Sequence, residues 1–167
     1  MEISIKKYKQ GQEIAIFQLI KAVYDAFVAI DYSPEGNAFF YDWIQPQKIA
    51  ERQLKQNNIW LAYMGAELAG VIEIRDNKFV SLLFVDKNYQ QQSIAKSLFD
   101  ASLREMKQRN SSLDKVYVHA SPFSIPIYRN MGFVETDDMC EENGIKYVPM
   151  EMIIKKWTIW KHIRILK

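Results

Sequence analysis

Residues 82–98 read Leu-Leu-Phe-Val-Asp-Lys-Asn-Tyr-Gln-Gln-Gln-Ser-Ile-Ala-Lys-Ser-Leu, where an apolar strand passes through a turn into a helix. The strand, residues 78–86, is almost entirely apolar from Phe79 to Val85, which predicts a central strand covered on both faces. The helix, residues 93–109, repeats its apolar residues at three- and four-residue spacing. A helix that begins near Gln92 presents unpaired backbone N–H groups and the positive end of its dipole. The start of this helix is therefore a predicted site for a small anion such as a diphosphate.

Upstream of this strand lie two further apolar segments, Ile59 to Met64 and Glu67 to Arg75. The links that join the three segments, Gly65-Ala66 and Asp76-Asn77, are so short that they can connect only antiparallel strands. Residue spacing predicts the remaining N-terminal elements: a strand over residues 1–6, a helix from Glu13 to about Ala29, a break over residues 31–37, and a helix from Gln47 to Gln56.

Downstream of the helix, Lys115 to His119 is a further apolar strand, and residues 121–131 are expected to be helical. Ser121 can cap that helix, Pro122 suits its first position, and Gly132 suits its end. Pro126 lacks an N–H group, so the helix is expected to be irregular or to begin near Ser124. Two more strands, Phe133 to Thr136 and Lys146 to Ile154, close the domain. This order predicts an α+β (mixed α/β) fold, with a mostly antiparallel sheet flanked by helices.

The bulk composition narrows the class of protein. The chain has 167 residues, 49% of them apolar, which is enough for one buried core and too little for two typical domains. Its 22 basic and 20 acidic side chains nearly cancel, which argues against a dedicated nucleic-acid binder. No apolar run approaches a membrane span and the N-terminus lacks the apolar core of a signal peptide, so a cytoplasmic protein without membrane insertion is expected. The lone cysteine, Cys140, excludes an internal disulfide and a multi-cysteine metal site.

Two motifs, Gln90-x-x-Ser93-x-Ala95 and the segment from Ser121 to Phe133, resemble those of the GNAT superfamily of acetyltransferases. Gln90-x-x-Ser93-x-Ala95 resembles that family's coenzyme A-binding motif, in which Gln or Arg is followed by two residues, Gly, one residue, and Gly or Ala. The segment Ser121 to Phe133 resembles the family segment that ends in Tyr, three residues and Gly-Phe. The motifs occur in the expected order and separation. The resemblance covers about residues 1–154 as one GNAT domain.

The resemblance implies an N-acetyltransferase that moves an acetyl group from acetyl-coenzyme A to a primary amine, without a metal. The backbone N–H of Phe84 or Val85 would stabilise the oxyanion, and Tyr128 would protonate the leaving thiolate. The base is left open between Glu73, a water chain and His119. The residues expected to contact the cofactor are Phe84, Val85, Gln90, Gln91, Gln92, Ser93, Ile94, Ala95, Lys96, Ser121, Phe123 and Tyr128.

Ser93 departs from the family motif because it stands where the motif has its first glycine. Its hydroxyl could add a hydrogen bond to phosphate, or its Cβ could hold the cofactor farther away. The departure leaves an alternative function open, that of a coenzyme A-binding or interaction domain of the same fold without turnover.

The acceptor pocket of such folds is walled by regions that correspond to residues 32–43 and 137–143. The first carries five aromatic residues, and the second carries Asp137, Asp138, Glu141 and Glu142, so an amine with a cationic end would fit. Residues 155–167 form a basic, aromatic extension with five Lys and Arg residues and no acid. This extension is expected to pack on the domain or on a second copy, as in a homodimer. A membrane or nucleic-acid contact by the extension is the competing interpretation.

Overall fold

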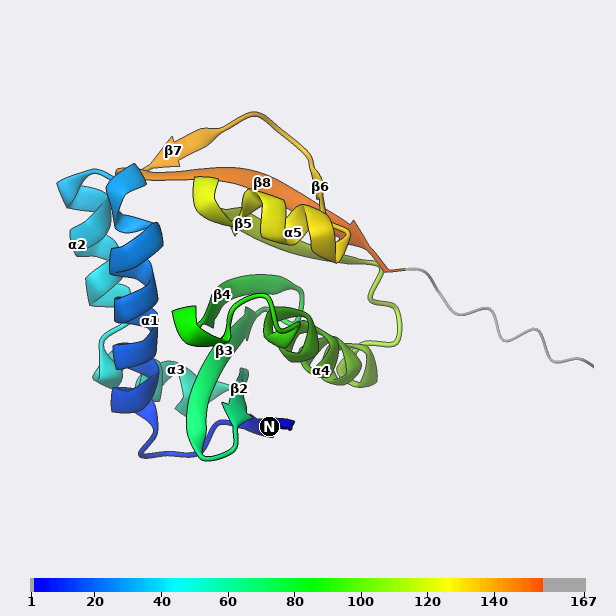
Figure 1. Cartoon of the computed structure of the whole chain (residues 1–167). Coiled ribbons are helices and arrows are strands. Elements are labelled where there is room, and N and C mark those ends of the chain that lie inside the picture. The colour runs from blue at the N-terminus through cyan, green and yellow to red at the C-terminus, as the bar shows by residue number, and fades with distance from the viewer. Residues whose placement is uncertain (1, 155–167) are drawn as a thin grey trace, which may run out of the picture.

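A computed structural model describes residues 2–154, and its strands run in the order β1-β2-β3-β4-β5-β8-β6, with β7 paired to β8 off this path (Figure 1). Every pair is antiparallel except β4 with β5, so the expected mixed, mostly antiparallel sheet is confirmed. The strand bounds are β1 Ile3–Lys7, β2 Ile59–Met64, β3 Glu67–Arg75, β4 Phe79–Val85, β5 Lys115–Ala120, β6 Val134–Glu135, β7 Cys140–Glu142 and β8 Ile145–Ile153.

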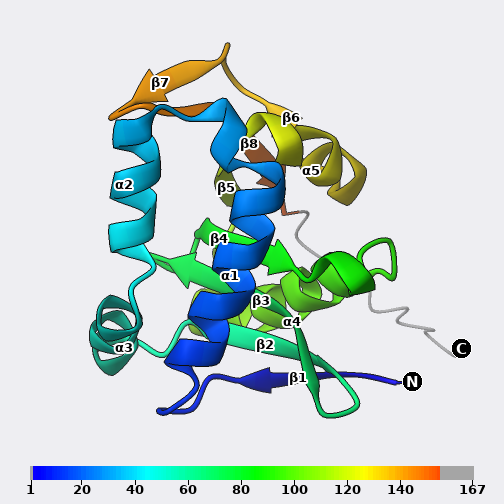
Figure 2. The same cartoon turned by 60° about the vertical axis from the view of Figure 1, so that its left-hand side comes forward.

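The helices lie on both faces of the sheet, with α1, α2 and α3 on one face and α4 and α5 on the other (Figures 1 and 2). Their bounds are α1 Glu13–Phe27, α2 Pro34–Trp43, α3 Pro46–Lys55, α4 Ile94–Arg109 and α5 Ile125–Met131, with 3-10 turns η1 Ala29–Asp31, η2 Lys87–Tyr89 and η3 Pro122–Ser124. No helix within residues 2–154 combines the length and apolarity that crossing a bilayer requires. The expected basic extension, residues 155–167, lies outside the described residues.

Two hydrophobic clusters hold these layers together, one on each face of the sheet. Beneath α1 and α3, Ile16, Ile20 and Ile49 pack on Leu61 and Val71. On the opposite face the side chains of α4 and α5 meet the sheet, and that cluster includes Trp60, Ile72, Ile94, Leu98, Phe99, Val118, Tyr128 and Phe133. Because β3 is buried from Ala69 to Ile74, it is the strand on which both layers rest.

The C-terminal half of β4 differs from expectation. Val80 and Leu82 are each 2% exposed, but Leu83, Phe84 and Val85 are only partly buried. The expectation that β4 is covered on both faces along its length was therefore wrong. The reason is that β5 pairs only with the first two residues of β4, Phe79 and Val80. The later residues of β4 therefore lie beside an open space.

Two elements were not expected from the sequence. The break over residues 31–37 contains the start of α2, where the Ser33 hydroxyl accepts a hydrogen bond from the Gly36 amide at 3.1 Å and Pro34 occupies the first turn. This Ser-Pro pair is itself a helix-start signal, so α2 could have been found. The second element, β7, is only three residues long and is too short to show a period.

The segment from Ser121 to Met131 is irregular at its start, as Pro126 indicated. A 3-10 turn, η3, precedes α5, which begins at Ile125 and ends at Gly132 in the left-handed conformation, with φ of 100°. The capping role expected for Ser121 was wrong, because its hydroxyl donates to Ser124 Oγ at 2.9 Å and caps no backbone amide.

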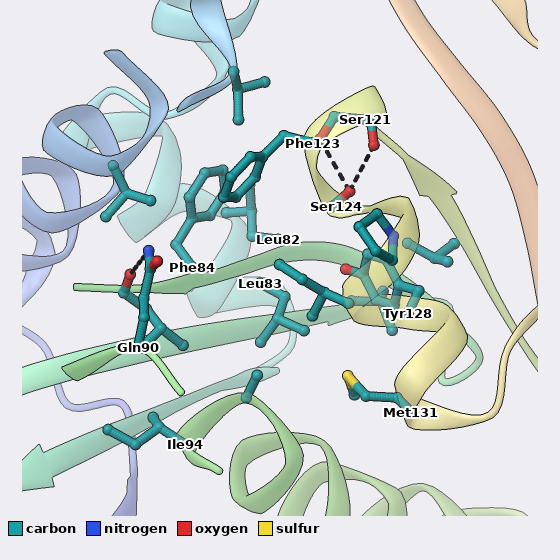
Figure 3. Close-up of a pocket in the computed structure, with 18 of the residues that line it drawn as sticks. Leu82, Leu83, Phe84, Gln90, Ile94, Ser121, Phe123, Ser124, Tyr128 and Met131 are labelled. Atoms are coloured by element: carbon teal, nitrogen blue, oxygen red, sulfur yellow. Dashed lines mark hydrogen bonds between the residues drawn. The ribbon is translucent and has the colours of Figure 1, made fainter. Parts of the chain in front are cut away.

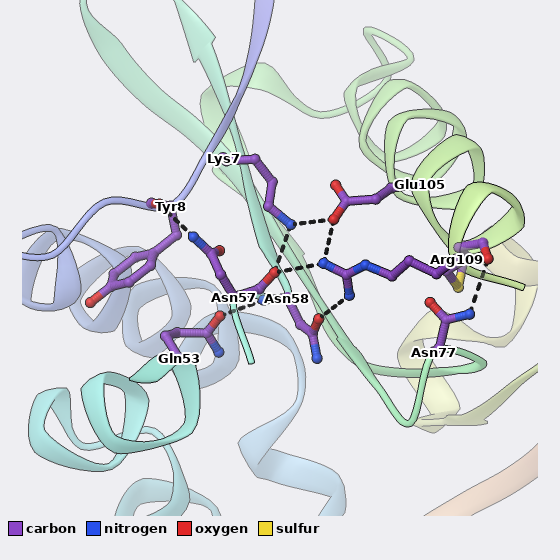
Figure 4. Close-up of polar contacts among 9 residues, drawn as sticks. Lys7, Tyr8, Gln53, Asn57, Asn58, Asn77, Glu105 and Arg109 are labelled. Carbon is purple, nitrogen blue, oxygen red and sulfur yellow. Dashed lines mark hydrogen bonds and ion pairs between the residues drawn. The ribbon is translucent and has the colours of Figure 1, made fainter. Parts of the chain in front are cut away.

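A polar network anchors the C-terminal end of α4 to the edge of the sheet (Figure 4). Lys7 Nζ donates to the Asn57 carbonyl at 2.7 Å and lies 3.2 Å from Glu105 Oε1. Arg109 also pairs with Glu105, and it donates to Asn58 Oδ1 at 2.8 Å. These contacts join β1, the loop before β2 and the C-terminal end of α4.

Candidate active site

The site begins where β4 and β5 part. Their pairing is limited to Phe79 with Tyr117 and Val80 with Val118, after which the two strands separate. A cavity of about 650 Å³ fills the space between them and is lined by β4, α1, α2, the N-terminus of α4, and α5. Its volume lies within the range of small-molecule and cofactor sites.

The backbone of β4 presents polar groups to this gap. The Asp86 amide donates to the Ala69 carbonyl of β3 at 2.9 Å. Because successive residues of a strand direct their backbone groups to opposite sides, the amides of Val85 and Leu83 face the gap and that of Phe84 faces β3. Of the two amides expected to stabilise an oxyanion, the structure therefore directs Val85 to the cavity. Phe84 lines the cavity with its side chain.

The N-terminus of α4 forms one end of the cavity. Its first intrahelical bond within the described chain runs from the Ser97 amide to the Ser93 carbonyl at 2.9 Å. The amides of Ile94, Ala95 and Lys96 therefore have no backbone partner among the described residues, and they carry the positive end of the helix dipole. This end suits a diphosphate.

The side chains of the first motif lie around this helix end. Gln90, Gln91, Ser93, Ile94, Ala95 and Lys96 line the cavity, whereas Gln92 does not. Gln90 Nε2 donates to the Val85 carbonyl at 3.2 Å, which ties the turn to the end of β4 (Figure 3). Gln92 Nε2 instead donates to the Asn88 carbonyl at 3.4 Å.

Ser93 adopts the backbone conformation that its motif reserves for glycine. Its φ is 61° and that of Gln91 is 60°, both in the left-handed region that side chains with a Cβ disfavour. We expect Ser93→Gly to raise the free energy of unfolding by about 0.5 kcal/mol, because relief of this strain exceeds the added freedom of the unfolded chain. Urea denaturation measures this change.

Two substitutions at this position test whether the Ser93 Cβ limits the approach of a bound phosphate. If its Cβ limits the approach, Ser93→Gly tightens acetyl-coenzyme A binding and Ser93→Ala, which keeps the Cβ, does not. If both variants bind more weakly than the wild type, the hydroxyl contributes a hydrogen bond and the steric interpretation is wrong.

Tyr128 of α5 lies in the cavity wall opposite Leu83 (Figure 3). The side chain is 5% exposed, and burial raises the pKa of its phenol, which therefore stays protonated at neutral pH. The turn at Gly132 brings Phe133 back onto the Tyr128 ring, with centroids 5.3 Å apart, and fixes its position.

Ser121 and Phe123, which were expected to contact the cofactor, also line the cavity. The Phe123 ring stacks on Phe27 at 4.8 Å between centroids, which joins η3 to the end of α1. Further lining residues were missed, among them Val23 and Tyr24 of α1, Val28 just after α1, and Pro126, Ile127, Asn130 and Met131 of α5. Val23 and Tyr24 belong to a segment predicted as helical, and nothing in helical spacing distinguishes a residue that lines a cavity from one that only packs in the core.

Glu73 does not reach this cavity. It is 4% exposed, and its carboxylate accepts from Arg52 Nε at 2.9 Å, Arg52 Nη2 at 3.1 Å and Gln53 Nε2 at 2.9 Å. Arg52 also lies over the Trp43 ring at 4.2 Å. A carboxylate held this way joins α3 to β3, and the structure gives no support to Glu73 as the base.

Glu73→Gln should therefore reduce stability and spare catalysis. The amide leaves the Arg52 charge without its partner, and we expect a loss of about 2 kcal/mol in the free energy of unfolding. The turnover of the folded variant should stay within about twofold of the wild type. Urea denaturation and rates at saturating substrate measure the two effects. A large fall in turnover at unchanged stability would restore Glu73 as a base.

His119 is the other named candidate for the base, and it does line the cavity. Its ring stacks on Tyr147 at 4.0 Å and meets the edge of Phe79 at 4.9 Å. Burial is the main cause that lowers the pKa of His119, so its imidazole is neutral at pH 7 and can accept a proton.

Of the two segments expected to wall the acceptor pocket, residues 32–43 and 137–143, only the first contributes to the cavity. Tyr32 and Phe40 line the cavity, but no residue of 137–143 does. The acidic segment pairs with β8, and the hairpin that it forms contacts α2 instead, where the Gly144 carbonyl accepts from the Ser33 amide at 3.1 Å. Among the described residues that line the cavity, none is Asp or Glu.

Comparison with known proteins supports an assignment to a family. Residues 28–154 match the model of the acetyltransferase (GNAT) domain. No curated protein matches the chain.

Solved structures show the same fold. A GCN5-related N-acetyltransferase from Rhodopseudomonas palustris is 18% identical with a TM-score of 0.78, over 92% of this chain and 97% of that chain. The PaiA N-acetyltransferase from Thermoplasma acidophilum, solved with coenzyme A, is 18% identical with a TM-score of 0.74, over 92% of this chain and 100% of that chain. A GNAT-family acetyltransferase from Staphylococcus aureus Mu50 is 21% identical with a TM-score of 0.71, over 92% of this chain and 100% of that chain.

Proposed function

The chain belongs to the GNAT acetyltransferase family, and from this premise we propose that it transfers an acetyl group from acetyl-coenzyme A to a primary amine. One observation carries the proposal. A single cavity brings together the open amides at the start of α4, the β4 amides that face the gap, and the Tyr128 phenol.

The residues present suit acetyl-coenzyme A at the α4 end. The diphosphate would accept hydrogen bonds from the amides of Ile94, Ala95 and Lys96, all three of which line this end of the cavity. The thioester supplies the acetyl group and a thiolate leaving group. The gap between β4 and β5 would hold the thioester carbonyl beside the amides of Leu83 and Val85, which would stabilise negative charge on its oxygen.

The transfer requires two proton movements. The neutral amine nitrogen attacks the thioester carbonyl carbon, a C–N bond forms, and the C–S bond breaks. Tyr128 donates its proton to the departing sulfur and regains one from solvent. The nitrogen loses a proton to water or to His119, the candidate base that lines the cavity. The products are an N-substituted acetamide and free coenzyme A.

Thermal unfolding with and without acetyl-coenzyme A tests the binding half of the proposal. A ligand at 100 times its Kd that binds only the folded state adds about 2.7 kcal/mol, which corresponds to a rise in Tm of roughly 5–10 °C. Inorganic phosphate at the same concentration is the control and should give little change.

Release of free thiol across an amine panel then tests the transfer. The absence of a Tm shift at millimolar acetyl-coenzyme A would overturn the proposal. A shift without thiol release from any amine would instead indicate a coenzyme A-binding domain that lacks turnover.

A further inference from the structure

The cavity has a second end, away from the α4 N-terminus, that the proposed cofactor position leaves free. It lies beneath α1 and α2 and is lined by Val28, Tyr32 and Phe40. Figure 3 shows Phe84 and Phe123 on the side of the cavity away from Ile94. The amine acceptor must enter here if the diphosphate occupies the helix end.

Aromatic rings dominate this end. Four of them, Tyr32, Phe40, Phe84 and Phe123, are neither fully buried nor exposed, so their faces or edges are available to a ligand. The Phe40 ring lies 6.0 Å from Phe84, measured between centroids. These four rings form an aromatic wall that a ligand at this end of the cavity would contact.

Contacts behind the wall hold these rings in place. Tyr24 is completely buried, stacks on Phe40 at 4.0 Å, and donates its hydroxyl to Asn37 Oδ1 at 2.6 Å. On the other side, Phe27 supports Phe123. The wall is therefore preformed, which favours a rigid apolar group over a flexible one.

Within residues 2–154, none of the side chains that line this surface carries a negative charge. No described lining residue is acidic, and the nearby carboxylate of Asp25 is engaged by Lys21 and by the Tyr41 hydroxyl. Asp31 lies next to Tyr32 and, after burial, is a cause of its pKa rise to about 12, but Asp31 does not line the cavity. A second ammonium group on the acceptor would lose its hydration here and gain no carboxylate partner.

We infer that the acceptor is a primary monoamine with an aromatic or similarly flat apolar body, and not a diamine or polyamine. The inference rests on the proposed function. The flat group packs against the surface that Phe40, Phe84 and Phe123 present to the cavity, and its amine points to the thioester in the gap of β4 and β5.

Steady-state rates with matched amines test this assignment. With saturating acetyl-coenzyme A, 2-phenylethylamine should show a kcat/KM at least tenfold above that of putrescine or spermidine. A short peptide with a free N-terminal alanine should likewise be at least tenfold poorer than 2-phenylethylamine.

A variant pair on α2 ties the preference to the wall. Phe40→Ala should raise the KM for 2-phenylethylamine about tenfold, change kcat less than threefold, and preserve the Tm shift caused by acetyl-coenzyme A. Phe39→Ala is the matched control, because Phe39 is 50% exposed and does not line the cavity, and it should leave KM unchanged.

Failure of this inference is separable from failure of the proposed function. If acetyl-coenzyme A binds and a polyamine or the peptide is the better substrate, the acceptor assignment is wrong and the acetyltransferase stands. Equal KM values for the two alanine variants would also overturn the assignment. If no amine releases thiol, the proposed function fails first.

Discussion

Tyr128→Phe is expected to lower kcat about 100-fold and to leave the Kd for acetyl-coenzyme A within about twofold. The substitution removes one oxygen and keeps the ring, which packs on Phe133. Without the phenol proton, the sulfur must depart as a free thiolate or take its proton from water. The interaction is made only as the C–S bond breaks, so its loss appears in kcat and not in binding.

The pH dependence adds an independent check. An unperturbed phenol loses its proton near pH 10, and burial raises the pKa of Tyr128 above that value. The group is therefore protonated across the whole range below about pH 10, and the wild-type rate should show no fall from its ionisation there.

A second tyrosine provides the control for Tyr128→Phe. Tyr117→Phe removes a phenol on β5 that does not line the cavity, and it should leave kcat unchanged. If Tyr128→Phe weakens acetyl-coenzyme A binding as much as it lowers turnover, Tyr128 is a binding residue and its role as the acid is excluded.

The sequence predicted the frame of this fold because its strongest signals are local. β2 and β3 begin and end at the predicted residues, since two-residue links leave antiparallel pairing as the only geometry. The strand, turn and helix at the proposed cofactor end could also be predicted as structure, because they are contiguous in the chain. Ser93 could be assigned to a glycine position from the motif, and the structure gives it a left-handed φ of 61°.

The acceptor end was less predictable because it depends on contacts between distant segments. Glu73 was placed near the centre by its strand, but Arg52, twenty-one positions earlier, determines where its carboxylate points. The acidic residues 137–143 were assigned to the pocket, yet a short hairpin with β8 carries them to the start of α2. Neither pairing leaves a periodic signal in the sequence.

Ala95→Glu is expected to raise the Kd for acetyl-coenzyme A at least 100-fold while the protein remains as stable as the wild type. Ala95 lies in the first turn of α4 and lines the cavity. A carboxylate in the first turn of a helix interacts favourably with the dipole, so folding is preserved. In the proposed complex the same carboxylate would stand where the diphosphate accepts its hydrogen bonds, and like charges at such short range repel strongly.

Ala95→Gln separates charge from size, since the two side chains have nearly the same volume. The neutral variant should weaken binding by a smaller factor that does not depend on salt. The penalty of Ala95→Glu should shrink as ionic strength rises from 0.01 M to 1 M, because the Debye length falls from about 30 to about 3 Å. Isothermal titration over that range measures both variants. Equal, salt-independent losses would mean that bulk alone blocks the site, and the α4 N-terminus would then not be where the diphosphate binds.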